Sequence, residues 1–318
     1  MKFYRMKLVG AFIKMIRVPN LFFIVLTQIL FHVSVLDKIL FPIGLRPVID
    51  GWNFLFLSVS SVLIAAAGYI INDYFDINID QVNKPRANVV DTVVARRWAM
   101  AWHFMLSGMG LLLSAYISWR TGLWYILLGN FGCVLLLFGY SVSLKRKLLF
   151  GNIIISLLTA WVILIICFAE IRLASQVSPT VAEASNKIIR IGILYAAFAF
   201  ISSLIREAIK DIEDMQGDAK YGCRTMPIVW GVNATKVYVA VWLVVILALL
   251  VILQIYVFRF GWWAAMAYSI VFIILPFVFI FLRLFKAKNQ KDYHQLSNWT
   301  KLVMLSGILS MLFFYFYL

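Results

Sequence analysis

The stretch INDYFDINID, residues 71–80, follows about twenty largely apolar residues, enough to cross a bilayer as one helix. It places Asn72, Asp73, Asp76 and Asp80 at the end of that membrane-spanning segment. A carboxylate in the hydrocarbon region is unfavourable by about 3 kcal/mol or more, and acids in such positions are usually paired and functional. These four side chains are the first candidates for a functional site.

Composition predicts an integral membrane protein. Of the 318 residues, 64% are hydrophobic and only 14% are charged, which excludes an ordinary soluble globular protein. Apolar windows long enough to span a bilayer occur at 18–36, 53–71, 99–119, 123–140, 152–170, 187–209, 235–256, 262–283 and 299–317. We expect an all-α, polytopic fold with nine transmembrane helices around a central cavity, forming a single membrane domain over residues 1–318.

The net charge of +15 is explained by topology, and no nucleic-acid partner is expected. With the N-terminus placed inside, 22 of the 29 Lys and Arg residues fall in inner segments. The positive-inside rule then predicts a cytoplasmic N-terminus and an external C-terminus, in a multi-pass protein of a prokaryotic cell (inner) membrane. The first apolar run lacks a small-residue cleavage site, so we expect it to stay in the mature protein.

A second acidic stretch, REAIKDIEDMQGD at 206–218, ends the sixth predicted span on the same side of the membrane. Its Asp211, Asp214 and Asp218 repeat the DxxDxxxD spacing of the first three aspartates, 138 residues later. On a helix that turns about 100° per residue, each trio falls within about 60° of arc. We therefore expect each trio to line one face of one helix.

A helix face with several carboxylates is unfavourable unless cations neutralise it. Mg²⁺ prefers oxygen ligands and is usually held by a few carboxylates together with substrate phosphates. The two faces therefore predict shared Mg²⁺ ions and a substrate that carries a diphosphate, which binds at the cytoplasmic side. The predicted metal ligands are Asn72, Asp73, Asp76, Asp80, Asp211, Asp214 and Asp218, of which Asp76, Asp80, Asp211 and Asp214 are also expected to be catalytic.

Two other interpretations apply to the acidic motifs. They could be solvated helix ends, or part of an ion or proton pathway in a transporter, since transporters also repeat halves and place carboxylates at membrane depth. A membrane scaffold protein is a third class. Two copies with equal spacing, in a chain with only 14 acidic residues, favour a functional site. Their position at helix ends beside basic residues favours an enzyme.

Basic residues lie close in sequence to both motifs and to the predicted inner ends of the first and fourth spans. Cations near bound Mg²⁺ can grip the oxygens of a diphosphate and stabilise it as it leaves. Ordinary positive-inside topology explains each of them equally well when it is taken singly. The expected catalytic cation is Lys145, and the expected substrate-binding residues are Arg17, Asn20, Lys84, Arg86, Tyr140, Arg146, Lys210 and Arg224.

Four stretches resemble the UbiA-type intramembrane prenyltransferases: RVPN at 17–20, NDYFDINID with NKPR at 72–86, YSVSLKRKLLFGN at 140–152, and REAIKDIEDMQGDAKYGCRTMPI at 206–228. In that family the Asp-rich motifs bind Mg²⁺ and a prenyl diphosphate. The resemblance implies these roles for Asn72, Asp76, Asp80, Asp211, Asp214 and Asp218, and contact with the diphosphate for Arg17, Asn20, Lys84 and Lys145. It further implies an isoprenoid tail among aromatic side chains such as Phe22, Phe23, Phe75, Tyr140, Trp161 and Tyr195.

The second motif and its RTMPI continuation look most like the digeranylgeranylglyceryl phosphate synthase branch. That branch transfers a geranylgeranyl group to a hydroxyl of geranylgeranylglyceryl phosphate, a lipophilic acceptor. A quinone precursor, a chlorophyllide-like molecule or a haem stays open as an aromatic acceptor, because the loop NKPRANVVDTVVARR, 83–97, lacks the usual RPIPSG-like continuation. An acceptor phosphate would find further cations in Arg146, Arg206 and Arg224, and Asp73 and Glu207 are candidate bases by proximity.

Overall fold

Helices form nearly all the regular structure in residues 2–83, 89–170 and 179–318, which the computed structural model describes. An isolated bridge between Val90 and Val94 is the exception. Within these ranges nine segments have the length and hydropathy of a membrane span: Val18–Ile43, Gly51–Phe75, Arg96–Thr121, Trp124–Val142, Phe150–Ala169, Pro179–Lys220, Val232–Phe258, Trp263–Leu284 and Gln290–Tyr317. The predicted all-α class and the nine predicted spans are confirmed.

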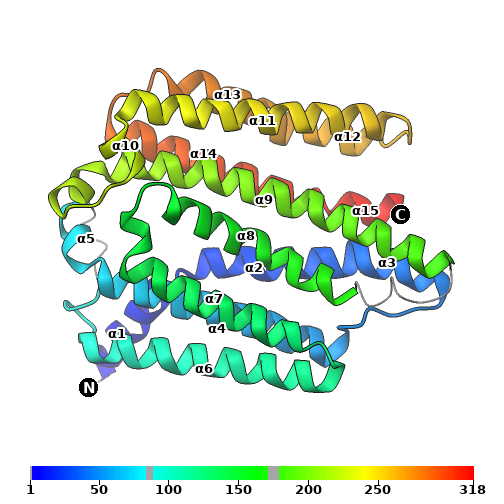
Figure 1. Cartoon of the computed structure of the whole chain (residues 1–318), viewed down its shortest axis with the longest axis horizontal. Coiled ribbons are helices and arrows are strands. Elements are labelled where there is room, and N and C mark those ends of the chain that lie inside the picture. Colours follow the sequence, from blue (N-terminus) through cyan, green and yellow to red (C-terminus); the bar gives the residue numbers. More distant parts are fainter. Residues whose placement is uncertain (1, 84–88, 171–178) are drawn as a thin grey trace.

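The helices are numbered in chain order, and Figure 1 labels most of them. Those that build the spans are α2 (Val18–Phe31) with η1 (His32–Leu36), α3 (Asp37–Leu40) and η2 (Phe41–Ile43); α4 (Gly51–Phe75); α6 (Arg96–Thr121); α7 (Trp124–Val142); α8 (Phe150–Ala169); α9 (Pro179–Lys220); α11 (Val232–Phe258); α12 (Trp263–Ser269) with η5 (Ile270–Ile274) and α13 (Leu275–Leu284); and α14 (Gln290–Leu309) with α15 (Leu312–Tyr317). The short or peripheral helices are α1 (Lys2–Met15), α5 (Ile77–Asn83), η3 (Leu144–Arg146) and α10 (Met226–Val229).

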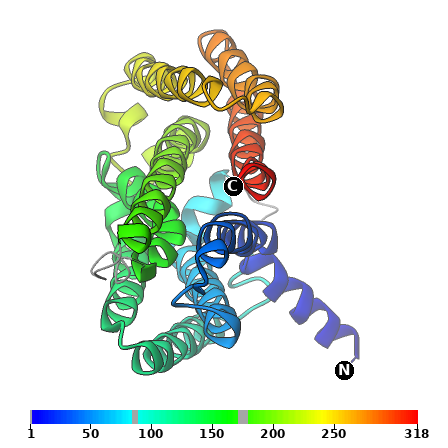
Figure 2. The same ribbon diagram turned by 90° about the vertical axis from the view of Figure 1, so that its right-hand side faces the viewer.

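Six of the spans form a closed ring. In this ring α2 contacts α4, α4 contacts α7, α7 contacts α8, α8 contacts α9, α9 contacts α14, and α14 returns to α2. Figure 2 shows these helices nearly end-on. The remaining spans lie outside the ring, with α6 against α4 and α7, α11 against α9 and α13, and α13 against α14.

Polar side chains and a glycine hold α6 against α4 and α7 of the ring. Ser60 of α4 and Ser114 of α6 share a hydrogen bond of 2.8 Å, and the Asn130 amide of α7 donates to the Ser114 hydroxyl over 2.8 Å. A Cβ at Gly110 would lie 2.8 Å from Ile64, so only glycine allows α6 to approach α4 this closely. Small residues and buried polar pairs are the usual means by which membrane helices associate.

The two chain ends lie at opposite ends of the helix bundle. In Figure 1, the N-terminus, α5 and α10 lie toward the left, and the C-terminus after α15 lies toward the right. The 42 residues of α9 extend for about 63 Å, roughly twice the hydrocarbon thickness of a bilayer. Its last turns therefore carry the second acidic motif to the end of the bundle where α5 and α10 lie.

The first acidic motif departs from the expected single helix face. Helix α4 ends at Phe75, and Asp76 is its C-cap with φ −93° and ψ 1°, after which α5 begins at Ile77. No glycine or proline marks this break in the sequence. Its physical cause is tertiary, because α5 turns to pack against α9. The second motif does lie on one continuous helix, as expected.

Candidate active site

A cavity of about 610 Å³ opens among the six ring helices. Its lining comes from the ring and from α1, α5 and η3, together with Val89 and the 223–225 segment, and no described residue of α6, α11, α12 or α13 contributes. The sequence led us to expect all nine spans around the cavity, but three of them pack on the outside of the ring. The predicted residues that line the cavity are Arg17, Asn20, Asn72, Asp73, Asp76, Asp80, Tyr140, Lys145, Lys210, Asp211, Asp214 and Asp218.

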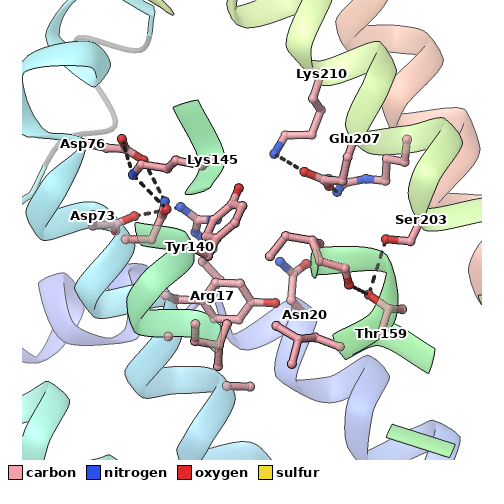
Figure 3. Close-up of a pocket in the computed structure, with 18 of the residues that line it drawn as sticks. Arg17, Asn20, Asp73, Asp76, Tyr140, Lys145, Thr159, Ser203, Glu207 and Lys210 are labelled. Carbon is pink, nitrogen blue, oxygen red and sulfur yellow. Dashed lines mark hydrogen bonds and ion pairs between the residues drawn. The ribbon is translucent and has the colours of Figure 1, made fainter. Parts of the chain in front are cut away.

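Three side chains of the first half of the site form a closed network. The Lys145 ammonium lies 2.5 Å from Asp76 Oδ1 and donates to Asn72 Oδ1 over 3.1 Å. The Asn72 amide donates to Asp76 Oδ2 over 2.8 Å. Figure 3 shows Asp76 and Lys145 of this network close together. Lys145 thus neutralises the carboxylate that caps α4.

Arg17 forms a second ion pair beside this network. Its guanidinium lies 2.7 Å from Asp73 Oδ1 and 5.0 Å from the centre of the Tyr69 ring. Burial alone would lower the pKa of Arg17, but the facing carboxylate of Asp73 raises the pKa above its ordinary value, so the side chain stays charged. Arg17 caps α2 in the left-handed conformation, φ 53° and ψ 55°, which is unfavourable by about 1 kcal/mol for a residue with a Cβ.

The second half of the site lies on α9. The Asn152 amide of α8 donates to Asp211 Oδ2 over 2.9 Å. One turn before Asp211, Glu207 is held by Arg206 at 2.8 Å and by Lys210 at 3.6 Å. Figure 3 shows Glu207 and Lys210 facing Asp76 and Lys145 across the cavity.

Asn83 joins the two halves of the site. Its Nδ2 donates to the carbonyl of Asp214 over 2.9 Å, and the backbone N–H of Gly217 donates to Asn83 Oδ1 over 2.8 Å. A Cβ at Gly217 would lie 2.5 Å from that oxygen, so glycine is required for α5 to come this close to α9. Asn83 therefore sets the separation of the two acidic motifs.

Several residues of the site were not predicted from the sequence. Gly217, in the otherwise helical sequence DMQGD, indicated that another segment packs closely against the helix at this point, as Asn83 does. Lone residues such as Asn152 and Lys301 carried no comparable signal. The structure adds Lys14, Asn83, Asn152 and Lys301 to the site, and it places Arg206 and Glu207, which were noted only as candidates, in the cavity lining.

Some predicted residues lie elsewhere. Arg146 and Arg224 are absent from the described lining and meet through a backbone hydrogen bond of 2.8 Å from Arg224 N to the Arg146 carbonyl. Lys84 and Arg86 lie outside the described residues. Among the aromatic side chains expected around an isoprenoid tail, Phe23, Tyr140 and Trp161 line the cavity, whereas Phe22, Phe75 and Tyr195 do not.

The donor atoms in the lining suit a hard divalent cation. The described lining has carboxylates and the Asn72 amide but no histidine. Burial raises the pKa of Cys223 to about 11, so this thiol is neutral at neutral pH and is a poor metal ligand. No three His, Cys, Asp or Glu side chains of the described residues converge on a point where they could hold a metal ion by themselves. Mg²⁺ would fit such a set if substrate phosphates supplied further oxygens.

The cavity is charged at one end and apolar at the other. On α4 the lining runs from Ser61 to Asp76, and on α9 from Ser203 to Asp218, with the acids at the same end of both helices. The apolar side chains deeper along the ring are Phe23, Ile24, Ile64, Leu137, Ile155, Leu158, Trp161, Val162 and Met304. Such a cavity fits a molecule with an anionic head and a hydrocarbon tail.

Comparisons with known proteins agree with this geometry. The UbiA prenyltransferase family matches residues 41–315. The chain is 29% identical over 255 residues to a digeranylgeranylglyceryl phosphate synthase of Methanosphaera stadtmanae, covering 80% of this chain and 84% of that protein. Other relatives of the same name match over a little more than half of their length.

Solved structures show the same fold. A structure of digeranylgeranylglyceryl phosphate synthase in membranes superposes with a TM-score of 0.60 at 23% identity, covering 95% of this chain and 98% of that one. A UbiA homolog from Archaeoglobus fulgidus bound to DMAPP and Mg²⁺ gives a TM-score of 0.57 at 14% identity, covering 95% and 99%.

Proposed function

Because the chain belongs to the UbiA prenyltransferase family, we propose that it transfers a geranylgeranyl group from its diphosphate to the free hydroxyl of geranylgeranylglyceryl phosphate, in a reaction that depends on Mg²⁺. The observation that carries this proposal is that both acidic motifs, with Lys145 and Arg17, line one cavity that continues into apolar side chains. The chain is a multi-pass integral membrane protein and a prenyltransferase. We place the reaction at the cytoplasmic side of a prokaryotic cell membrane, on the basis of the positive-inside rule.

The residues of the charged end would bind the donor. Mg²⁺, held by diphosphate oxygens and by Asn72, Asp76, Asp80, Asp211, Asp214 and Asp218, would neutralise the diphosphate and favour its departure. Lys145 and Arg17 line the same cavity and would donate hydrogen bonds to the same group. Phe23, Tyr140 and Trp161 would hold the first isoprene units and keep water from the allylic carbon.

The reaction itself is a substitution at the allylic carbon C1. The C1–O bond breaks as the acceptor oxygen bonds to C1, and the diphosphate leaves with the electron pair. The hydroxyl proton passes to a carboxylate of the cavity, for which Asp73 and Glu207 are both available. Each is held by a cation in this structure, Asp73 by Arg17 and Glu207 by Arg206 and Lys210.

The donor half of the proposal is tested with purified protein in detergent and geranylgeranyl diphosphate. We expect release of diphosphate with Mg²⁺ and none with a chelator. Asp76→Ala and Asp214→Ala should lose this activity while they retain the thermal unfolding profile. Glu183→Ala is the matched control, since Glu183 is an exposed acid on α9. Full activity in both aspartate variants would overturn the mechanism.

The acceptor is tested by a panel: a prenylglyceryl phosphate, 4-hydroxybenzoate, a dihydroxynaphthoate and a haem. We expect the prenylglyceryl phosphate alone to give product, as the names of the relatives suggest. If an aromatic compound of the panel is prenylated and the prenylglyceryl phosphate is not, the protein is still a prenyltransferase, but the proposed acceptor is wrong.

A further inference from the structure

The charges in the cavity are unevenly distributed. The two motifs place six aspartates in the cavity lining, where Arg17 pairs with Asp73 and Lys145 pairs with Asp76. A second group, Arg206, Glu207, Lys210 and Lys301, has three cations and one carboxylate, so two positive charges remain. Burying such an excess is unfavourable unless an anion compensates it.

Lys301 is the clearest part of this second group. Its ammonium extends from α14 into the cavity, donates to Asn20 Oδ1 over 2.6 Å and lies 5.3 Å from the centre of the Phe23 ring. No carboxylate of the described residues lies within ion-pair distance of it. A neutral amide and an aromatic face hold the ammonium in place but leave its charge uncompensated.

Arg206 supplies a second unmet donor. Its terminal nitrogen pairs with Glu207 at 2.8 Å, but its Nε is buried and has no hydrogen-bond acceptor among the described residues. Buried donors in native proteins nearly always have an acceptor. An anion beside Arg206 and Lys301 would provide one.

Part of this second group lies deeper in the cavity than the second acidic motif. Arg206 precedes Asp211 by five residues on α9, about 7.5 Å further from the charged end of the helix. Asn20, which Lys301 contacts, lies at the start of α2 and is hydrogen-bonded to Tyr69. A diphosphate bound at the aspartates would therefore have Arg206 deeper in the cavity, on the side of the apolar lining.

We propose that Lys301, Arg206 and Lys210, with Asn20, form a second anion subsite that binds the phosphate monoester of the acceptor. The inference rests on the proposed function and adds to it the group that recognises the acceptor head. A phosphate monoester carries about −1.5 to −2 charges at neutral pH, which matches the two uncompensated positive charges. The hydroxyl of a glyceryl phosphate is only one or two carbons from the phosphate ester, so a phosphate at this subsite places the hydroxyl near the allylic carbon.

The test is Lys301→Met, which keeps the length of the side chain and removes its charge. With saturating geranylgeranyl diphosphate, we expect the KM for a prenylglyceryl phosphate to rise about tenfold or more, since hydrogen bonds to charged groups are among the strong ones. The KM for geranylgeranyl diphosphate should change less than about twofold. Lys301→Arg should restore most of the affinity. Lys291→Met, which changes an exposed lysine on the same helix, is the matched control.

A second readout does not depend on turnover. The prenylglyceryl phosphate should raise the Tm of the wild-type protein but not that of Lys301→Met, whereas geranylgeranyl diphosphate with Mg²⁺ should raise both. The corresponding prenylglycerol, which lacks the phosphate, should shift neither. Protein that shows these shifts but transfers no prenyl group would refute the proposed function and keep the subsite.

Three outcomes would overturn the subsite. The first is an equal rise of both KM values in Lys301→Met, which would assign Lys301 to the donor diphosphate. The second is equal use of prenylglycerol and its phosphate by the wild-type enzyme. The third is a Lys301→Met variant that loses binding of 4-hydroxybenzoate while it keeps that of the phosphate.

Discussion

Replacing Lys145 should lower the rate of the reaction while the protein still folds. Its ammonium pairs with Asp76 and Asn72, and both partners line the cavity. Lys145→Met removes the cation that would stabilise the leaving diphosphate, so we expect kcat to fall about 100-fold. Lys147→Met, two residues along and exposed, should leave kcat unchanged. The measurement is diphosphate release at saturating substrates, and equal rates in the two variants would exclude a role for Lys145 in the reaction.

Glu170 gives a second residue-scale prediction, at the other end of α8. Burial raises the pKa of its carboxyl to about 7, although the backbone N–H of Val48 donates to Oε1 over 2.9 Å. The folded state therefore binds this proton more tightly than the unfolded chain does. Protonation of Glu170 contributes its full stabilisation of the folded state below about pH 4.5, and this contribution is lost as the pH rises through 7.

Glu170→Gln should therefore be more stable than the wild type at pH 8, by at most about 3 kcal/mol, and similar to it at pH 4.5. The glutamine oxygen can still accept from Val48. The Tm of the two proteins in detergent, compared at each pH, checks this, with Glu183→Gln as an exposed control. A constant difference in Tm across this range would contradict the assignment.

At the scale of elements, the contact between α5 and α9 sets the distance between the two motifs. Gly217→Ala would place a methyl group 2.5 Å from Asn83 Oδ1 and force α5 away from α9. A misplacement of about 1 Å can lower catalytic rates about 100-fold, so we expect activity to fall by at least tenfold. Gly108→Ala on α6, where a Cβ meets open space, should keep full activity.

A double-mutant cycle makes this prediction specific. In an Asn83→Ala background the added methyl group no longer meets the Asn83 amide, so Gly217→Ala should lower activity much less than it does in the wild type. Equal effects in the two backgrounds would show that Gly217 acts through something other than Asn83.

The sequence predicts elements better than their ends. Hydropathy suffices for the nine spans because each needs only about 20 apolar residues. It does not predict that α9 continues to Lys220, because charged residues end the apolar window while the helix continues along α5 and α10. The break at Asp76 has no local signal either. The aspartates are identifiable as a repeated pattern, whereas Lys301 and Asn152 gain their significance only from contacts across the ring.

At the scale of the whole molecule, the site exists only when the ring is closed. The aspartates come from α4, α5 and α9, and Lys145 and Asn152 come from η3 and α8. A ligand that contacts all of these elements binds only the folded ring, so it should raise the Tm. A ligand that contacts one motif alone should raise it less.

This argument predicts that Mg²⁺ and the diphosphate stabilise the protein together and not singly. The carboxylates of the motifs disfavour a diphosphate in the absence of metal ions, and no three acidic, His or Cys side chains of the described residues converge on a metal ion without the diphosphate. We expect small Tm shifts with Mg²⁺ alone or with a non-reactive geranylgeranyl diphosphate analogue plus a chelator. Both ligands together at about 100 times their Kd should stabilise the fold by about 2.7 kcal/mol. Asp214→Ala should lose this joint shift and Glu183→Ala should keep it, whereas a full shift with Mg²⁺ alone would show that the carboxylates form a complete metal site by themselves.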